Sequence, residues 1–330
     1  MEFLKSLPKK VNEYNYFKKE EKGCTLISFS EKKRVVIECK LEEFEIEQDF
    51  CIDDKAINMM LALQPINSIK VDNLFIIKSK KGTYKAKLLD KKPINIAKDF
   101  TNKVVVESSR LLKASKFVSD NDSRPILCSV CITEYGDLYA SDSYKAYRYI
   151  ARDLSIENYS SINVPKDFIE LICKECGANI EIEYNSNLCC VKNNNISYIS
   201  PLYEGIYPKI DQLYKMKNNL NKLIFDLQDL LDKLNIAKQV GNDLSNKNIA
   251  LLFANNKLTA IGDDEFEADL VNIRENVDYH FTLVFSNFAN IISCIDQNEK
   301  FIEMNYIESV RPIFIEDNKN EILVLPIRNN

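Results

Sequence analysis

The chain has 330 residues, of which 45% are hydrophobic and 28% are charged, and its formal net charge is −5. This length is enough for two or three globular domains, and the acidic balance argues against a surface that is basic throughout, as many nucleic-acid-binding proteins have. No apolar run reaches the roughly 18 residues that a membrane span needs, and the N-terminus lacks the apolar core of a signal peptide. We therefore expect a cytoplasmic protein whose cysteines are reduced thiols.

A strand followed by an apolar helix is predicted at three places, in residues 49–63, 161–175 and 280–294. Asp53 in the first copy and Ser286 in the third are suited to the N-cap of the helix, because short polar side chains accept hydrogen bonds from first-turn amides. The recurrence of one local pattern predicts a repeated architecture.

Two longer strand–helix segments alternate with these copies, at residues 103–118 and 222–240. The second has the stripe of a helix packed on a core, at Leu227, Leu230, Leu231 and Leu234. Alternating strands lie between the helices, separated by turn signals such as Tyr135-Gly136.

The repeat interval of about 110–120 residues has the size of a domain rather than of a solenoid unit. The sequence therefore predicts an α+β protein of three tandem domains, at residues 1–98, 99–214 and 215–330. Each domain is expected to pack two helices on an antiparallel sheet.

Catalytic and metal-binding residues are sparse. His280 is the single histidine and lies in an alternating apolar run, so no Ser-His-Asp or Cys-His mechanism is indicated. Cys173 and Cys176 have the C-x-x-C spacing of half a zinc site, and Cys189 and Cys190 could complete four thiolates. Structural thiols are the favoured interpretation, because neighbouring residues of a strand point to opposite faces.

Four segments, in chain order, resemble the bacterial sliding clamp, the β subunit of DNA polymerase III. "RPILCSVCITEYGDLYASDSYKAYRYI" is similar to the family segment that begins R-P-I-L and ends T-D-G-H-R-L-A. The second segment, "VPKDFIELI", is similar to the family's V-P-x-K-x-x-x-E-L, and the third, "LYEGIYPKIDQLYK", to its L-I-x-G-x-Y-P-D-Y-x-x-V-I-P. The fourth, "SVRPIFIEDNKNEILVLPIRNN", is similar to the family's P-L-x-I-R-P and final V-M-P-M-R-L.

The resemblance implies three DNA-clamp domains per chain and a head-to-tail homodimer that closes as a ring around double-stranded DNA. Such a clamp has no catalytic residues or cofactors of its own. It binds DNA without sequence preference and tethers DNA polymerase and the clamp loader through their short linear motifs, which raises processivity. The first domain has a shortened start compared with the family.

The partner peptide is expected in a groove between the second and third domains. The family's groove positions fall on Leu127, Ser141, Ser143, Tyr144, Lys145, Ala146, Pro208, Gln212, Leu213, Leu323, Val324, Leu325, Pro326, Ile327 and Arg328. Tyr144-Lys145-Ala146 stands where the family has His-Arg-Leu, and Leu325 and Ile327 replace methionines. We therefore expect an altered peptide preference.

Basic residues on helices are expected to face the DNA phosphates. The candidates are Lys9, Lys10, Arg110, Lys113, Lys116, Lys174 and Lys233. The resemblance also implies a dimer interface that joins Tyr84 and Ala86 of one protomer to Leu244 of the other.

Two alternatives remain open. A divergent clamp-like protein could act as a protein-interaction hub or an inhibitor without ring closure. A zinc-binding protein built on Cys173, Cys176, Cys189 and Cys190 is the other.

Overall fold

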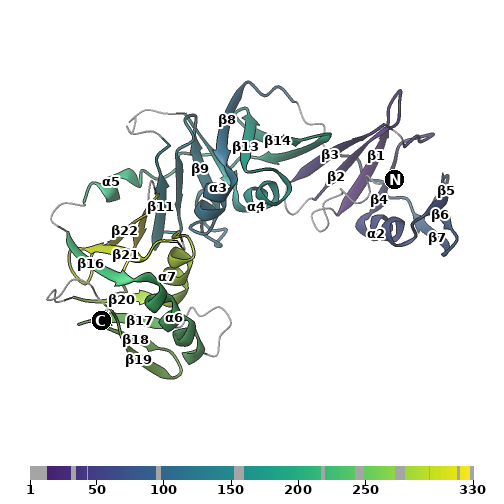
Figure 1. Cartoon of the computed structure of the whole chain (residues 1–330). Coiled ribbons are helices and arrows are strands. Elements are labelled where there is room, and N and C mark those ends of the chain that lie inside the picture. Colours follow the sequence, from purple (N-terminus) through teal and green to yellow (C-terminus); the bar gives the residue numbers. More distant parts are fainter. Residues whose placement is uncertain are drawn as a thin grey trace. The chain divides into compact units, whose positions relative to one another are not determined.

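The computed structural model describes residues 13–30, 35–42, 44–93, 98–151, 160–216, 220–241, 249–271, 279–296, 298–317 and 320–327. The chain forms two compact units (Figure 1). Unit 1 comprises residues 1–108 and 167–203, and unit 2 comprises residues 109–166 and 204–330. The chain therefore passes from one unit to the other three times.

Unit 1 contains an eight-stranded antiparallel sheet with the strand order β4-β1-β2-β3-β15-β14-β13-β8. Four of its strands come from the first hundred residues: β1 (Tyr14–Lys19), β2 (Cys24–Phe29), β3 (Val36–Leu41) and β4 (Phe50–Asp53). The others are β8 (Asn102–Glu107), β13 (Asn179–Tyr184), β14 (Leu188–Asn193) and β15 (Ile196–Pro201). The two halves join where β3 pairs with β15, for example at Ile37 and Tyr198.

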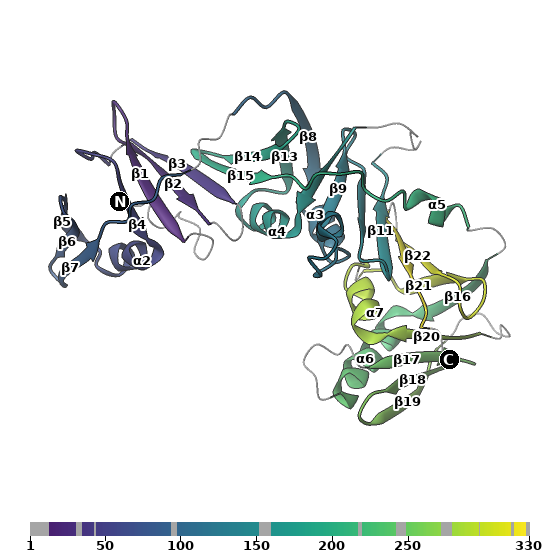
Figure 2. The same ribbon diagram turned by 180° about the vertical axis from the view of Figure 1, so that it is seen from behind.

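The helices of unit 1 bury one apolar face each. In α2 (Asp54–Ala62) the buried residues are Ala56, Ile57 and Met60, and in α4 (Lys166–Glu175) they include Phe168 and Ile172. A second, three-stranded sheet consists of β5 (Ile66–Val71), β6 (Leu74–Ser79) and β7 (Gly82–Lys87). Figures 1 and 2 both show this small sheet beside α2.

Unit 2 contains the second eight-stranded sheet, in the order β12-β9-β10-β11-β23-β22-β21-β16. Its first half is β9 (Ser129–Thr133), β10 (Leu138–Ser141), β11 (Lys145–Tyr149) and β12 (Ser161–Pro165). Its second half is β16 (Asn221–Asp226), β21 (Phe301–Tyr306), β22 (Ile313–Asp317) and β23 (Asn320–Val324). The halves join through β11 and β23, where Lys145 lies opposite Val324 and Arg148 opposite Glu321.

A four-stranded sheet completes unit 2, in the order β19-β18-β17-β20, from β17 (Ala250–Ala254), β18 (Lys257–Ile261), β19 (Glu265–Asp269) and β20 (His280–Val284). Its helices are α3 (Ser108–Ser115), α5 (Asp211–Tyr214), α6 (Leu227–Ala237) and α7 (Phe285–Ile292), with short 3-10 turns at Pro125–Cys128 and Lys238–Val240. Figures 1 and 2 both show α6 and α7 next to each other beside the four-stranded sheet.

The fold class predicted from the sequence is confirmed, because helices accompany sheets whose described strand pairs are antiparallel. Leu227, Leu230 and Leu234 are buried in α6 as expected, whereas Leu231 of the same predicted stripe is only half-buried. Asp53 caps α2 by accepting a hydrogen bond from the Ala56 amide at 2.8 Å. The N-cap predicted at Ser286 is wrong, because α7 begins at Phe285 and Val284 occupies the cap.

The division into three domains remains a prediction. In the described part of the chain, no helix is long and apolar enough to cross a membrane. Lys9, Lys10, Leu244 and Arg328 lie outside the described residues.

Candidate partner-binding site

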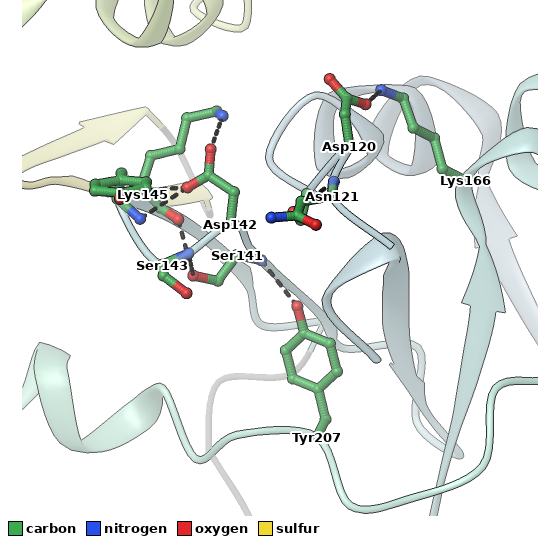
Figure 3. Close-up of polar contacts among 10 residues, drawn as sticks. Asp120, Asn121, Ser141, Asp142, Ser143, Lys145, Lys166 and Tyr207 are labelled. Atoms are coloured by element: carbon green, nitrogen blue, oxygen red, sulfur yellow. Dashed lines mark hydrogen bonds and ion pairs between the residues drawn. The ribbon is translucent and has the colours of Figure 1, made fainter. Parts of the chain in front are cut away.

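The turn between β10 and β11 is organised by Asp142 (Figure 3). Its Oδ1 accepts hydrogen bonds from the amides of Tyr144 and Lys145, each at 2.8 Å, and its Oδ2 pairs with the Lys145 ammonium. This is the turn that a short acidic side chain favours, because the carboxylate replaces backbone acceptors. Ser143 in the turn has a φ of 80°, in the left-handed region. The turn places Tyr144 outward, with 64% of its surface exposed.

The C-terminal residues after β23 lie against this turn. The Leu325 amide donates to the Tyr144 carbonyl at 2.8 Å, and the Ile327 amide donates to the Thr282 carbonyl of β20 at 2.7 Å. Leu325 and Ile327 are each 37% exposed. Two backbone hydrogen bonds therefore fix a short run that presents apolar side chains to solvent.

A third segment, residues 204–216, is held to the same sheet at both of its ends. At one end the Ser141 amide of β10 donates to the Tyr207 hydroxyl at 2.8 Å (Figure 3). At the other end the Tyr214 hydroxyl donates to the Glu321 carbonyl of β23 at 3.0 Å. Burial raises the pKa of Tyr214 well above its usual value, so the hydroxyl stays protonated and able to donate.

Tyr207, Ile210 and Tyr214 point into an apolar cluster under this segment. The cluster also contains residues from β9, β10, β11, β22, β23 and the 3-10 turn before β9, at Leu127, Cys131, Tyr139, Ala146, Phe314 and Leu323. The tyrosines belong to the same buried cluster as Ala146, which is 1% exposed. The segment therefore turns its remaining side chains outward.

Exposed apolar side chains accumulate on these three segments. We call this set the apolar patch; its members are Tyr144, Ile206, Leu213, Leu325 and Ile327, with exposed fractions of 64%, 90%, 36%, 37% and 37%. Isolated exposed apolar residues are ordinary, but several on segments that hydrogen-bond to one sheet are typical of an interaction surface.

The structure divides the groove residues predicted from the sequence into two groups. Those that face solvent at least in part are Ser143, Tyr144, Pro208, Gln212, Leu213, Leu325, Pro326 and Ile327. The buried ones are Leu127, Ser141, Lys145, Ala146, Leu323 and Val324. The second group supports the surface from beneath, and Lys145 in particular is 5% exposed, with its charge paired to Asp142.

Sequence reasoning missed Ile206 in the patch and Tyr207, Ile210 and Tyr214 beneath it. The alternation of "EGIYPKI" carries a signal for Tyr207, because Ile206 and Pro208 are exposed while Tyr207 between them is buried. Gly205 at φ 119°, with its carbonyl bound by the Asn163 side chain at 3.0 Å, orients this stretch.

Comparisons with known proteins give one consistent result. A β sliding clamp of Staphylococcus epidermidis is 25% identical over an alignment of 230 residues. The match covers 64% of this chain and 59% of that protein, so it spans less than two thirds of the relative. The solved β chain of DNA polymerase III from Streptococcus pneumoniae has a TM-score of 0.80 with 17% identity, over 99% of this chain and 97% of its own. A putative DNA polymerase III β subunit from Eubacterium rectale has a TM-score of 0.81 with 17% identity, over 98% and 94%.

This chain has the sliding-clamp fold. The resemblance inferred from the four sequence segments is thereby confirmed by both kinds of comparison. No protein-family model matches the chain.

The basic residues predicted to face DNA differ in their surroundings within the clamp fold. Lys174 on α4 has a side chain 75% exposed, and Lys116 after α3 is exposed and donates to Ser293 Oγ at 3.1 Å. The Arg110 guanidinium lies 4.0 Å from the centroid of the Tyr149 ring, and Lys113 is half-buried. Lys233 pairs with Asp229 at 2.5 Å, so its charge is largely offset within α6.

Two of the residues predicted for the dimer interface, Tyr84 and Ala86, lie on a sheet edge. Tyr84 and Ala86 are half-buried on β7, which ends the three-stranded sheet. They share a face with Phe75 and Ile77 of β6, both 0% exposed, whereas Lys85 and Lys87 point to the other face and are exposed.

The cysteines proposed as zinc ligands do not gather into a site. In the described part of the chain, no group of three or more His, Cys, Asp or Glu residues could hold a metal ion. Cys189 and Cys190 are buried in β14, and Cys173 donates to the Ser108 carbonyl at 3.5 Å. Burial raises the pKa of Cys176 and of Cys190 to about 11, which opposes the thiolate form that zinc requires. The zinc alternative is not supported.

Proposed function

We propose that this chain is a DNA polymerase processivity factor: a sliding clamp that encircles double-stranded DNA and tethers polymerase without catalysing a reaction. The observation that carries the proposal is the clamp fold, matched over 99% of the chain with a TM-score of 0.80. A tether of this kind acts by effective concentration, because a polymerase held to a ring rebinds its template before it diffuses away.

The apolar patch is the proposed dock for polymerase and clamp loader. Short linear motifs place a few apolar side chains into such a surface, and the surrounding backbone supplies polar groups. Tyr144, Leu213, Leu325 and Ile327 provide the apolar contacts, and Ser143 and Gln212 are exposed beside them. The buried tyrosines beneath support a surface that already exists before the peptide arrives.

Two edge strands support head-to-tail closure of a homodimer. β7 ends the small sheet of unit 1, and β19 ends the four-stranded sheet of unit 2. A free strand edge is a template for pairing with another chain. On β19, Phe266 and Ala268 lie on the side of the buried Ala260 and Leu258, and Glu265, Glu267 and Asp269 are exposed on the other side.

The two edges are complementary in charge on one face, and both carry apolar side chains on the other. An antiparallel pairing of β7 with β19 of a second copy brings Lys85 and Lys87 beside the glutamates of β19 on one face. On the other face it brings Tyr84 and Ala86 beside Phe266 and Ala268. Opposite charges directly across strands stabilise pairing, whereas β7 with β7 or β19 with β19 would oppose like charges. This pattern favours a heterologous contact, which can close into a ring.

Lys116 and Lys174 are the proposed phosphate contacts of the ring. Sequence-independent binding needs mobile cations near phosphates rather than side chains that read bases. Lys233 contributes less than expected, since Asp229 holds it.

The test is topological. The protein is cross-linked across its own dimer contacts in the presence of a nicked circular plasmid, and the complex is washed in high salt. A ring stays on the circle and leaves when the plasmid is cut once. Equal retention on circular and linear DNA, or no retention on either, contradicts the sliding clamp and favours the alternative of a clamp-like interaction hub or inhibitor without ring closure.

A further inference from the structure

Arg148 forms a partly buried polar cluster on the strands and the short helix that carry the apolar patch. Its side chain is 16% exposed. Its Nε and Nη2 both bind Glu321 Oε2, and its Nη1 donates to Asp211 Oδ1 at 2.9 Å. The guanidinium also lies 4.3 Å from the centroid of the Tyr214 ring. We call Arg148, Asp211, Tyr214 and Glu321 the Arg148 cluster.

The Arg148 cluster connects three elements that are distant in sequence. Arg148 belongs to β11, Glu321 to β23, and Asp211 and Tyr214 to α5. The Tyr214 hydroxyl adds a second link to β23 through the Glu321 carbonyl. A planar guanidinium can bind two carboxylates and stack on a ring at once, which a lysine cannot do.

The element most dependent on these links is α5, because it has only four residues. So short a helix has no stability of its own, since nucleating a helical turn costs more than one turn returns. Its apolar anchors are Ile210 and Tyr214, and its polar anchor is Asp211. The outward residues Gln212 and Leu213 depend on these anchors for their position.

The cluster lies close to the other half of the patch. Along β11, Arg148 is three residues from Lys145, whose partner Val324 precedes Leu325. Three residues of strand span about 10 Å. The Arg148 side chain thus links α5, which carries Leu213, to β11, which begins after Tyr144, and to β23, which ends before Leu325.

From this geometry we infer that Arg148 is a positioning residue for partner binding: it holds α5 against β11 and β23, so that Leu213 and Gln212 meet the partner peptide in a preformed arrangement. The inference rests on the proposed function of the patch. A buried ion pair contributes little to net stability relative to apolar replacements of the whole group, but it restricts the arrangement of the elements that it joins. Preorganisation of this kind raises affinity by lowering the ordering cost of binding.

The test measures binding of a synthetic peptide with the C-terminal sequence of the DNA polymerase from the same genome. Arg148→Met is expected to weaken binding about tenfold, mainly through faster dissociation. Arg148→Lys is expected to recover only part of the loss. The matched control is Lys222→Met, which removes an exposed ion pair with Glu303 between β16 and β21 of the same unit and leaves binding unchanged.

A purely structural role is separated by two further measurements. Leu213→Ala is combined with Arg148→Met. Because both substitutions act through α5, the double variant is expected to bind the peptide about as tightly as whichever single variant has the lower affinity. The second measurement uses a triple variant that neutralises the whole cluster, Arg148→Met/Asp211→Asn/Glu321→Gln. This variant is expected to fold and to bind the peptide as weakly as Arg148→Met does. Its backbone amides at residues 211–214 are expected to exchange hydrogen faster than those of the wild type.

The outcomes distinguish the inference from the function it rests on. A wild-type protein that binds no peptide at high concentration overturns the proposed docking site, and the inference with it. A wild-type protein that binds, while Arg148→Met binds equally well or its loss adds fully to that of Leu213→Ala, overturns the inference alone.

Discussion

At the scale of single residues, Ser143 is unusual because it holds a φ of 80° without being glycine. The left-handed region crowds the β-carbon against the backbone and costs a non-glycine residue roughly 1 kcal/mol or more. Ser143 Oγ accepts a long hydrogen bond from Arg124 Nη1, at 3.4 Å. The hydrogen bonds of Asp142, and the one that the Ser143 amide donates to Ser141 Oγ at 3.1 Å, therefore hold a backbone conformation that Ser143 itself disfavours.

Ser143→Gly is expected to raise the free energy of unfolding of unit 2 by about 0.5 kcal/mol, because the strain released exceeds the extra entropy of glycine in the unfolded chain. Urea denaturation measures the change. Ser197→Gly, in the interior of β15, is the control and is expected to destabilise. A loss of stability for Ser143→Gly contradicts the assigned strain.

Eight of the ten cysteines are buried, and Cys173 and Cys176 are half-buried. Burial raises the pKa of Cys24 and of Cys131 to about 12, and that of Cys176 and Cys190 to about 11. The thiolate is the reactive form of cysteine. Because the pKa values of these thiols are raised, only a small fraction of each is thiolate at pH 8.

Native protein at pH 8 is accordingly expected to react with iodoacetamide about a hundredfold more slowly than unfolded protein. The half-buried Cys173 and Cys176 are expected to react before Cys131. Mass spectrometry after timed quenching identifies the labelled positions. Prompt labelling of Cys131 would show that its surroundings open readily, and stoichiometric zinc in purified protein would reinstate the metal alternative.

At the scale of elements, the β10–β11 turn is held by the Asp142 carboxylate together with Ser141 Oγ, which donates to the Lys145 carbonyl at 2.9 Å. Asp142 serves two amides and the buried Lys145, whose side chain is 6% exposed. Removing one partner of a buried ion pair leaves an uncompensated charge, which costs more than losing both partners.

Asp142→Ala is expected to lower the free energy of unfolding by about 3 kcal/mol, and Asp142→Ala/Lys145→Met is expected to recover part of the loss. Lys257→Ala, which breaks the exposed pair with Glu267, provides the comparison at under about 1 kcal/mol. Urea denaturation measures the free energy of unfolding of all three variants. A double variant no more stable than Asp142→Ala would assign the loss to the amide hydrogen bonds instead.

Local structure was predictable where it depends on local periodicity. The stripe of Leu227, Leu230 and Leu234 predicted α6, and an aspartate before an apolar run predicted the cap of α2. Ser286 misled because α7 begins at Phe285, directly after β20 ends at Val284, and no side chain caps the helix. The patch was only partly predictable. The sequence motifs identified Tyr144, Leu213, Leu325 and Ile327 but missed Ile206. They also gave no sign that Lys145 and Val324 point inward, since the facing of a side chain depends on strand pairing.

At the scale of the whole molecule, the pairing of distant strands had no sequence signal. β3 pairs with β15, and β11 with β23, although about 160 to 180 residues separate the partners. An alternation of apolar residues predicts a strand, but it does not specify which other strand will pair with it. The resemblance to the clamps supplied the fold that periodicity alone left undetermined.

The proposed dimer is expected to respond to charge at its edges. Lys85→Glu/Lys87→Glu is expected to yield monomers in sedimentation velocity at micromolar concentration, because like charges then oppose Glu265 and Glu267. Mixing it with a Glu265→Lys/Glu267→Lys variant is expected to restore the pairing at that contact. Lys78→Glu, on the inner strand β6, is the control and keeps the wild-type state. A wild-type protein that sediments only as a monomer, or a charge-reversed variant that remains dimeric, contradicts this edge contact.

The joined sheets also determine how the chain tolerates being divided. A break near residue 98 separates β1–β4 from β8 and β13–β15, although the hydrogen bonds between β3 and β15 run through the middle of one sheet. Each fragment alone would carry an unpaired strand beside buried residues such as Ile37 and Tyr198. Such edges aggregate when exposed, but they also recognise each other. Residues 1–98 and 99–330, expressed together as separate chains, should therefore reassemble into one complex, as complementary halves of a split protein.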